Sequence, residues 1–471
     1  MSSQRYAIAH RYLRDGALPS KPSVQRSTSV LVIGAGLAGI TTFHLLRSHG
    51  VDVHCVEAES SVGGCAINGA SPSGKAFPRG TVYFVDQTPV LTELIHSAGC
   101  TVVDCPDDAY RFGNSLVRSL WTDESIRSLT IAENDKQGML RFRDHLLASV
   151  DEVPSYPLPR HLSRRERELD TQSAADYLHP YASPTLEAVL DAYCRSSMGA
   201  PLQDVNAYAL MNFYSSELGD AFRSSRRTLV GGLGALADGL MRDAGERLVA
   251  ETVAVHMERK PNGIIAVTTV NEEGVVTAWS AEHVVLATPA HVSKRLLMNV
   301  SPVASERLHT LSQAPYMTVA VELDRPVFTS GAYDTWHVPA DSGYTDVITP
   351  DVVARPPSID SAQWVCVYAP QPIQDRKLLQ AEDVVAVRAR DCAVEAVQRE
   401  GGLAESIVSV HAWTWGHGFS VPRPGSHAAL VGLQDTLPRD VHVAGTDTCG
   451  APAMENAIAS AVIAVERIIG R

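Results

Sequence analysis

The chain has 471 residues, of which 45% are hydrophobic and 20% are charged, and its formal net charge is −13. This length predicts two or three structural domains, and the acidic balance disfavours non-specific binding to nucleic acid. The eight cysteines are scattered, with no CxxC pair and no cluster with histidine, which predicts reduced thiols, no metal site and a cytoplasmic protein.

The first 29 residues are polar and lack the apolar core of a signal peptide. We interpret residues 1–29 as an N-terminal extension that forms either a short helix or a disordered arm. No apolar run in the chain approaches the roughly 20 residues that a membrane-spanning helix needs. We therefore expect no membrane span.

The next stretch has the order strand, helix, strand. The apolar segment SVLVIGAG leads into the helical segment LAGITTFHLLRSHG and then into VDVHCVEA, which is the pattern of a parallel βαβ unit. Gly34, Gly36 and Gly39 form G-x-G-x-x-G at the first turn, where glycines permit a tight turn, a close approach of a pyrophosphate and close helix packing. Glu57 ends the second strand, where a carboxylate can bind ribose hydroxyls. These residues predict a dinucleotide site at the helix N-terminus.

In the rest of the chain the sequence pattern changes from strands to polar helices and then back to strands. Residues from about 100 to 225 favour polar helices, which we interpret as a mostly helical insertion. Strands follow around turns at PNG and EEG, and MTVAVELDRPVF and QWVCVYAP predict strands of a second region. The last segment predicts a strand, VHVAGT, and an amphipathic helix capped by Gly470.

Four stretches resemble one family of flavoproteins. The segment EAESSVGG, from Glu57 to Gly64, resembles the second fingerprint of the FAD-dependent amine oxidase superfamily, which includes monoamine oxidases, protoporphyrinogen oxidases and phytoene-desaturase-like proteins. The segment VHVAGTDTCGAPAMENAIASAVIAVERI resembles its closing motif, and residues 77–99 and 229–292 resemble its segments beside the flavin ring and the adenine. The resemblance implies an α/β fold with a Rossmann-like FAD-binding domain built from discontinuous segments and a mixed-sheet plus helical substrate domain.

The resemblance also implies domain boundaries and a cofactor site. Residues 30–100, 226–300 and 405–471 would form the FAD-binding domain, and residues 101–225 and 301–404 the substrate-binding domain. Val253 would hold the adenine through its backbone, Asp447 would contact the ribityl or phosphate region, and Met454 would lie beside the flavin. The full set of implied FAD-binding residues is Gly34, Gly36, Leu37, Ala38, Gly39, Glu57, Ala58, Gly63, Gly64, Cys65, Gly80, Thr81, Val253, Gly445, Asp447, Ala453 and Met454.

Three departures from the family pattern bear on the substrate. Cys65 stands where the family commonly has an arginine, so Arg79 or Lys75 is expected to supply charge near the diphosphate. Thr318 stands where amine oxidases have a lysine near flavin N5 that helps oxygen react. Ala453 stands where they have one aromatic wall of a cage for the amine. The last two changes disfavour oxidation of a simple amine, and protoporphyrinogen oxidases and carotenoid-type desaturases tolerate them.

The substrate cavity is expected to involve residues from several segments. The implied substrate residues are Tyr83, Thr318, Trp415 and Ala453. In the segment HAWTWGHGFSVPRPGSH, Trp413 and Phe419 are further candidates for the cavity wall or for the core. Three histidines, His411, His417 and His427, are candidate proton carriers or structural residues.

The sequence therefore predicts an FAD-dependent oxidase or dehydrogenase. It would take a hydride from a small organic substrate onto flavin N5, by desaturation or by C–N or C–C oxidation, as a biosynthetic tailoring step in secondary metabolism. The expected partner is a small-molecule substrate, with no nucleic acid, and a homo-oligomer is compatible with the sequence. Two alternatives remain open: a redox-neutral FAD-dependent isomerase, in which the reduced flavin returns the hydride, and a non-catalytic flavin-binding protein.

Overall fold

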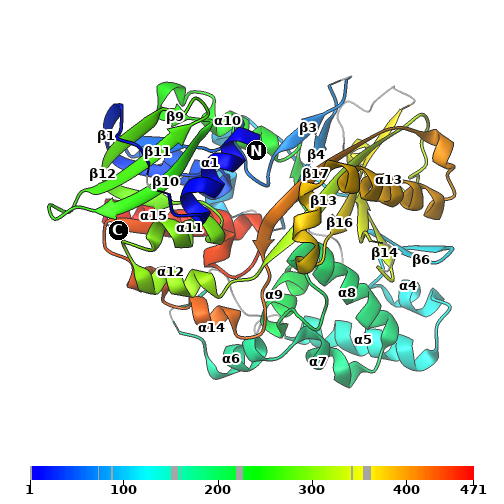
Figure 1. Ribbon diagram of the computed structural model, residues 1–471. Helices are drawn as coiled ribbons and strands as arrows, with labels where there is room; N and C mark the ends of the chain where they lie inside the picture. Colours follow the sequence, from blue (N-terminus) through cyan, green and yellow to red (C-terminus); the bar gives the residue numbers. More distant parts are fainter. Residues whose placement is uncertain are drawn as a thin grey trace.

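The computed structural model describes residues 3–17, 19–72, 74–85, 88–149, 158–159, 161–218, 226–340, 343–353 and 362–470. Two larger sheets organise these residues, and Figure 1 shows them in separate halves of the molecule. Two short antiparallel two-stranded sheets, β3–β4 (Asn68–Ala70 and Ala76–Pro78) and β5–β8 (Val102–Asp104 and Arg227–Leu229), complete the strands of the described ranges.

The first sheet has the order β10-β11-β12-β1-β2-β9, and β18 pairs with β12. Its strands are β1 (Val24–Ile33), β2 (Val53–Val56), β9 (Leu248–Val249), β10 (Thr252–Arg259), β11 (Ile265–Asn271), β12 (Val276–Leu286) and β18 (Val441–Val443). β1 runs parallel to both β2 and β12, as the βαβ pattern predicts. Segments from three distant parts of the sequence therefore meet in one sheet.

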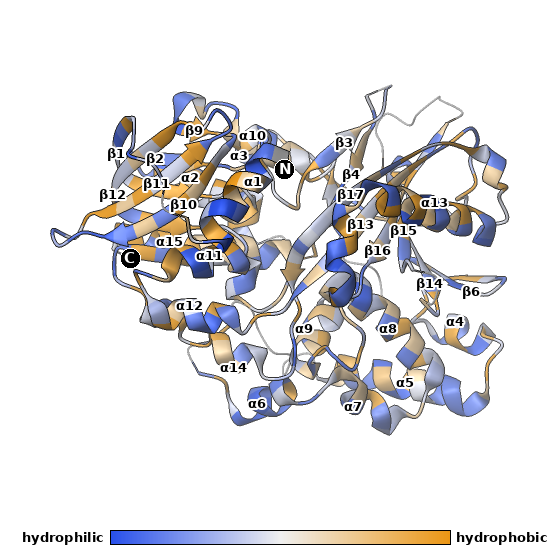
Figure 2. Ribbon diagram, viewed as in Figure 1, coloured by the Kyte–Doolittle hydropathy of each residue, from blue (hydrophilic) through white to orange (hydrophobic). Residues whose placement is uncertain are grey.

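Helices cover both faces of this sheet because its central strand is apolar on both sides. Val30 and Val32 of β1 pack against α2 (Leu37–Ser48), α3 (Pro89–Ala98), α10 (Gly234–Met241) and α15 (Met454–Ile469). Leu31 and Ile33 face the other side, toward α11 (Ala290–Leu297) and α12 (Pro302–His309). Figure 2 shows apolar strands and helices in the interior of this part of the molecule.

The second sheet has the order β17-β13-β16-β15-β14-β6-β7. Its strands are β6 (Ala109–Phe112), β7 (Ser115–Arg118), β13 (Gln313–Leu323), β14 (Asp334–Val338), β15 (Asp346–Ile348), β16 (Gln363–Pro370) and β17 (Ile407–Ser420). α13 (Glu382–Arg399) packs on one face of it. A helical layer follows the lower side in Figure 1, with α4 (Asp123–Ser128), α5 (Glu133–Ala148), α6 (Arg164–Thr171), α7 (Ala174–Leu178), α8 (Pro184–Met198) and α9 (Ala207–Leu218).

The packing shows where two segments near the expected domain boundaries lie. β17 pairs with β13 from Gln313 to Leu323, so residues 407–420, which belong to the expected FAD-binding segment 405–471, form part of the second sheet. Ala304 and Leu308 of α12 are buried in the core that contains Val441. This helix therefore packs with the first sheet and not with the rest of residues 301–404. The sequence could not place these segments because an apolar strand or helix face does not state which sheet it covers.

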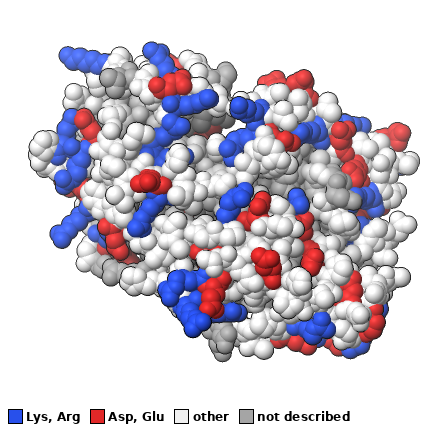
Figure 3. All heavy atoms as spheres, turned by 60° about the horizontal axis from the view of Figure 1, so that its bottom comes forward, with Lys and Arg blue, Asp and Glu red and all other residues white. Residues whose placement is uncertain are grey.

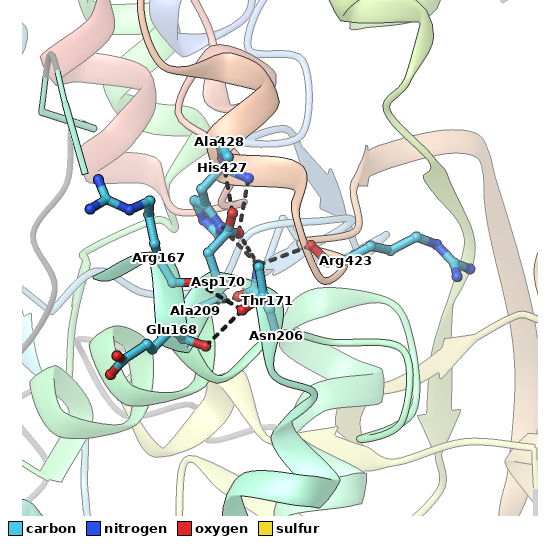
Figure 4. Close-up of polar contacts among 9 residues, drawn as sticks. All are labelled: Arg167, Glu168, Asp170, Thr171, Asn206, Ala209, Arg423, His427 and Ala428. Carbon is cyan, nitrogen blue, oxygen red and sulfur yellow. Dashed lines mark hydrogen bonds and ion pairs between the residues drawn. The ribbon is translucent and has the colours of Figure 1, made fainter. Parts of the chain in front are cut away.

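A buried polar cluster joins the helical layer to the loop before α14 (Ser426–Leu430) (Figure 4). Asp170 accepts hydrogen bonds from His427 Nδ1 at 2.8 Å and from the backbone N–H groups of His427 and Ala428 at 3.0 Å each. Asn206 donates to Asp170 Oδ1 at 3.0 Å, and all three side chains are fully buried. Asp170 therefore fixes the start of α14 against α6 and α9.

Three further features concern the surface charge, the helices and the cysteines. On the face shown in Figure 3, acidic and basic side chains are interspersed. Across the described ranges, we find no helix with both the length and the apolar character needed to cross a bilayer. All eight cysteines are free thiols.

Candidate functional site

A cavity of about 370 Å³ lies at the carboxyl ends of β1 and β2, where an open parallel sheet binds its ligands. Fifteen of the seventeen residues expected to hold FAD line it: Gly34, Gly36, Leu37, Ala38, Glu57, Ala58, Gly63, Gly64, Cys65, Thr81, Val253, Gly445, Asp447, Ala453 and Met454. Gly80 lines a neighbouring cavity, and Gly39 lies behind the glycine turn. We call this space the cofactor cavity.

The three glycines of the first turn are required for different structural purposes. A Cβ on Gly34, whose φ is +102°, would lie 2.5 Å from the carbonyl oxygen of Ala287, and a Cβ on Gly39 would lie 1.8 Å from that of Gly34. A Cβ on Gly36 would meet only the Cα of Gly64, at 3.9 Å. Gly34 and Gly39 therefore permit backbone packing, whereas Gly36 keeps open the space into which a ligand can approach the backbone.

Two helices begin at the cofactor cavity. α2 begins directly after Gly36, and α15 begins directly after Ala453. Neither residue has a side chain that could accept a hydrogen bond from the first backbone N–H groups of its helix. These N–H groups and the positive ends of the two helix dipoles favour a negatively charged ligand, such as a diphosphate or a reduced flavin.

Glu57 shapes the end of the cofactor cavity nearest β2. Its carboxylate accepts hydrogen bonds from the backbone N–H of Ala35 at 2.6 Å and of Glu59 at 2.8 Å. Burial raises the pKa of Glu57, and these hydrogen bonds oppose the rise. A carboxylate has further lone pairs, so the arrangement fits the binding of ribose hydroxyls.

Asp447 links the elements that form the opposite wall of the cofactor cavity. It accepts hydrogen bonds from the backbone N–H of Ala290 at 2.6 Å, from Gln313 Nε2 at 2.9 Å and from Ser420 Oγ at 2.6 Å. Burial raises its pKa, against the effect of these donors. Asp447 thus joins α11, β13 and β17, and it presents its buried carboxylate to the cavity from a fixed position.

The expected substitutes for the missing arginine lie elsewhere. Lys75 Nζ is 3.6 Å from Asp351, and the guanidinium of Arg79 lies 4.6 Å from the ring centroid of Trp413. Among the described residues that line the cofactor cavity there is no lysine or arginine, and burial lowers the pKa of His291, which also lines it, to about 4, so this side chain is neutral at physiological pH. A diphosphate in this cavity would rely mainly on backbone N–H groups and helix dipoles.

Cys65 lies where the cofactor cavity meets a second cavity, and it lines both. Its Sγ lies 3.6 Å from the carbonyl oxygen of Gly418. The Cys65 side chain is exposed to the two cavities, and the surrounding protein, with a contribution from Asp447, raises the pKa of its thiol to about 11. Cys65 is therefore a neutral thiol at physiological pH, at a more central position than the sequence pattern indicates.

The second cavity, of about 300 Å³, adjoins the cofactor cavity, and we call it the substrate cavity. The two share a wall formed by Cys65, Thr81, Gly418, Phe419, Pro452, Ala453 and Met454. All four expected substrate residues, Tyr83, Thr318, Trp415 and Ala453, line it. A ligand in the cofactor cavity and a ligand in the substrate cavity would therefore meet at this shared wall.

One face of the second sheet forms much of this cavity. Directly paired residues of neighbouring strands point to the same face, and the register pairs Trp336 with Asp346, Asp346 with Tyr368, and Tyr368 with Thr318. All four residues of this row line the cavity. Thr318 Oγ1 donates to the carbonyl oxygen of Arg79 at 2.8 Å, so the row is anchored to the segment before Gly80.

Two buried aspartates, which the sequence analysis missed, give the cavity a negative charge. Asp346 is 3% exposed, and burial raises its pKa to about 6 although Ser196 and Thr345 donate hydrogen bonds to it. Asp334 is 1% exposed, and its Oδ2 lies 3.4 Å from Nη1 of Arg226, which also pairs with Asp108. Carboxylates inside strands are unusual, and this was the signal that could have identified both residues.

Aromatic side chains enclose the remaining space. Tyr316, Tyr368, Trp336, Trp415 and Phe419 line the cavity. The hydroxyl of Tyr368 donates to the carbonyl oxygen of Gly80 at 2.6 Å, and Trp415 Nε1 donates to that of Arg79 at 3.0 Å. These bonds fix the rings, so the cavity has rigid aromatic walls beside its carboxylates.

The other candidates from the C-terminal segment lie outside the cavity. Trp413 packs against Phe77, with ring centroids 5.6 Å apart. His411 is exposed, His417 stacks on His291 at 3.9 Å, and His427 belongs to the buried cluster of Figure 4. None of the three histidines lines the substrate cavity as described. Within the described parts of the chain, no group of three or more potential ligands is arranged to hold a metal ion.

Comparison with known proteins places this geometry in a family. The model of the family described as "Flavin containing amine oxidoreductase" matches residues 37–469. An L-amino-acid oxidase of Demansia vestigiata is 22% identical over 302 residues, which are 61% of this chain and 55% of that protein, so the match spans about half the length of this relative.

Two solved structures share the fold. A double mutant of putrescine oxidase, made in a redesign of cofactor binding, superposes with a TM-score of 0.76 at 16% identity, over 95% of this chain and 100% of that chain. The cyclohexylamine oxidase of Brevibacterium oxydans superposes with a TM-score of 0.69 at 18% identity, over 94% of this chain and 100% of that chain.

Proposed function

Because the chain belongs to the flavin-containing amine oxidoreductase family, we propose that it is an oxidase or dehydrogenase that binds FAD in the cofactor cavity and oxidises a small cationic amine in the substrate cavity. The observation that carries this proposal is the shared wall of the two cavities, with buried carboxylates on the substrate side. When bound, the flavin supplies a hydride acceptor.

The residues of the cofactor cavity fit FAD in five respects. Gly36 leaves room for a diphosphate at the start of α2, Glu57 is placed to bind ribose hydroxyls, and Val253 offers backbone groups beside them. The start of α15 at Met454 would stabilise negative charge on a reduced flavin. The second glycine pair, Gly63 and Gly64, lines the same cavity.

The residues of the substrate cavity favour a cation. Asp346 and Asp334 present two carboxylates, and Arg226 offsets part of their charge from behind. An amine enters as an ammonium ion and must lose a proton before its neighbouring C–H bond can give up a hydride. Asp346, with a pKa of about 6, can hold the ammonium group and accept that proton.

In the balanced reaction the ammonium ion would give one proton to Asp346, and the neutral amine would then lose a hydride to the bound flavin and become a protonated imine. Water then hydrolyses the imine to a carbonyl compound and ammonia or an amine. Aromatic walls from Tyr368, Trp415 and Phe419 would exclude water during hydride transfer and restrict the substrate to a small molecule.

Anaerobic mixing of the purified flavoprotein with amines tests the proposal. Alkyl amines and diamines of increasing length should bleach the flavin absorbance, whereas alcohols of the same length should not, because they lack the cation. Bleaching by the alcohols, or protein that retains no flavin, would contradict the proposal. Catalytic turnover without an electron acceptor would instead identify a redox-neutral isomerase.

A further inference from the structure

The N-terminal segment covers one end of the cofactor cavity. α1 (Ser3–Ala9) and the following π-helical turn η1 (His10–Arg14) lie beside β10 and α11 in Figure 1. Ala9 and Leu13 line the cofactor cavity together with Glu57, Ala58 and Val253. This is the end of the cavity that fits a ribose and a base, so the segment covers the position of an adenosine.

Apolar packing holds the segment in this position. Ala9, Tyr12 and Leu13 pack against a cluster of buried valines in the β10–β12 meander, Val253, Val255, Val270 and Val276. Leu13 also contacts the core beneath α11, and Arg295 of that helix donates a hydrogen bond to the carbonyl oxygen of Leu13. The segment is thus attached to the same strands that form the cavity wall.

Arg5 adds a charged anchor. It is 5% exposed and lies 3.6 Å from Glu59, 3.3 Å from Glu251 and 3.1 Å from Glu272. These carboxylates come from three separate loops, after β2, before β10 and between β11 and β12. Without Arg5 they would repel one another at the rim of the cavity, because like charges at short range are unfavourable in a partly buried site.

The segment also reaches the second half of the molecule. Gln380, at the end of the helical turn before α13, donates from Nε2 to the hydroxyl of Tyr6 at 2.8 Å. One short helix therefore contacts the sheet that forms the cofactor cavity and an element packed on the other sheet.

We propose that residues 3–14 form a latch that closes over the adenosine half of the bound FAD and slows its release. The inference rests on the proposed use of the cofactor cavity, and it assigns a binding role to a segment that precedes the family match at residue 37. Arg5 is a positioning residue in this latch, and Leu13 is its apolar contact with the cofactor cavity.

The rate of FAD release tests the latch. Arg5→Gln should increase the dissociation rate constant by about tenfold or more, where tenfold corresponds to about 1.4 kcal/mol, measured as the rise of free-FAD fluorescence after dilution. Arg11→Gln is the matched control, because Arg11 is exposed on the same segment and lies over the ring of Tyr12. Leu13→Ser should act in the same direction as Arg5→Gln without altering a charge.

A measurement on the unaltered protein gives a second readout. The coupling between bound FAD and the closed latch is reciprocal in free energy, so FAD should increase the population of the closed latch and thereby reduce trypsin cleavage after Arg11 and Arg14. Equal cleavage with and without FAD, or release from Arg5→Gln at the rate of Arg11→Gln, would overturn the latch while leaving the FAD site intact. Protein that binds no FAD would overturn the latch and the proposed function together.

Discussion

Replacing Asp346 by asparagine should remove a pH dependence of stability that the native carboxylate creates. Burial raises the pKa of Asp346 to about 6 from the ordinary 3.8. The folded state therefore binds more protons than the unfolded state between about pH 4 and pH 6, and the free energy of unfolding falls as pH rises through this window. Above about pH 7 the loss is complete, and below about pH 3 it is absent.

The size of the effect follows from the pKa difference. At about 1.36 kcal/mol per unit, the shift corresponds to about 3 kcal/mol in full, of which about 2 kcal/mol falls between pH 4 and pH 7. Asp346 is 3% exposed, so little of this is screened by solvent. As the pH rises from 4 to 7, the stability of Asp346→Asn relative to the native protein should increase by about 2 kcal/mol, because asparagine stays neutral.

Urea unfolding of the flavin-free protein at several pH values measures this difference. Asp104→Asn, at an exposed position on β5, serves as the control and should track the native protein. Parallel pH profiles for the native protein and Asp346→Asn would refute the buried-carboxylate argument. With flavin bound, the same variant should lower kcat/KM for a cationic amine, and unchanged kinetics would show that the ammonium binds elsewhere.

Three further outcomes follow from the geometry. Gly36→Val should leave the protein folded but without bound flavin, because its side chain would enter the open cavity. Gly39→Ala should destabilise the fold itself, because its Cβ would lie 1.8 Å from the carbonyl oxygen of Gly34. Flavin absorbance and urea unfolding distinguish the two effects. Thr318→Lys should speed reoxidation of the reduced flavin by oxygen in stopped-flow measurements, and an unchanged rate would argue against a position of residue 318 beside the flavin ring. Asp170→Ala should lower the free energy of unfolding by about 3–5 kcal/mol, because it leaves buried donors of the Figure 4 cluster without their acceptor; a loss below about 1 kcal/mol would show that the cluster rearranges.

The cofactor cavity could be predicted from the sequence because its residues act through local backbone geometry. Gly34 needs a positive φ, Glu57 follows a strand directly, and Met454 begins a helix, and each of these features is written in a few neighbouring residues. Fifteen of the seventeen expected FAD residues line one cavity for this reason. The motif fixes the local conformation, and the parallel sheet then brings the strand ends to one edge.

The charge of the substrate cavity could not be predicted in the same way. Asp334 and Asp346 belong to separate strands, and Asp346 shares a row with Thr318 only through the pairing of β15 with β16 and of β16 with β13. Strand register over long sequence separations depends on which strands are neighbours, which hydropathy does not reveal. The placement of β17 in the second sheet was missed for the same reason.

This row of residues changes what the two family departures imply. Relative to the family pattern, Ala453 replaces an aromatic residue that would form a wall on the helix side of the cavity, and Thr318 replaces a lysine. Yet Tyr368 is paired directly with Thr318 and is aromatic, and Asp346 is the next residue of the row. A cationic amine would thus be recognised from the sheet, by a carboxylate and rigid rings, and not from the start of α15. Threonine at position 318 also leaves out a positive charge that would repel an ammonium group near Asp346. The departures are therefore compatible with an amine substrate held in a different orientation, and the comparison of amines with alcohols decides between this interpretation and oxidation of an uncharged substrate.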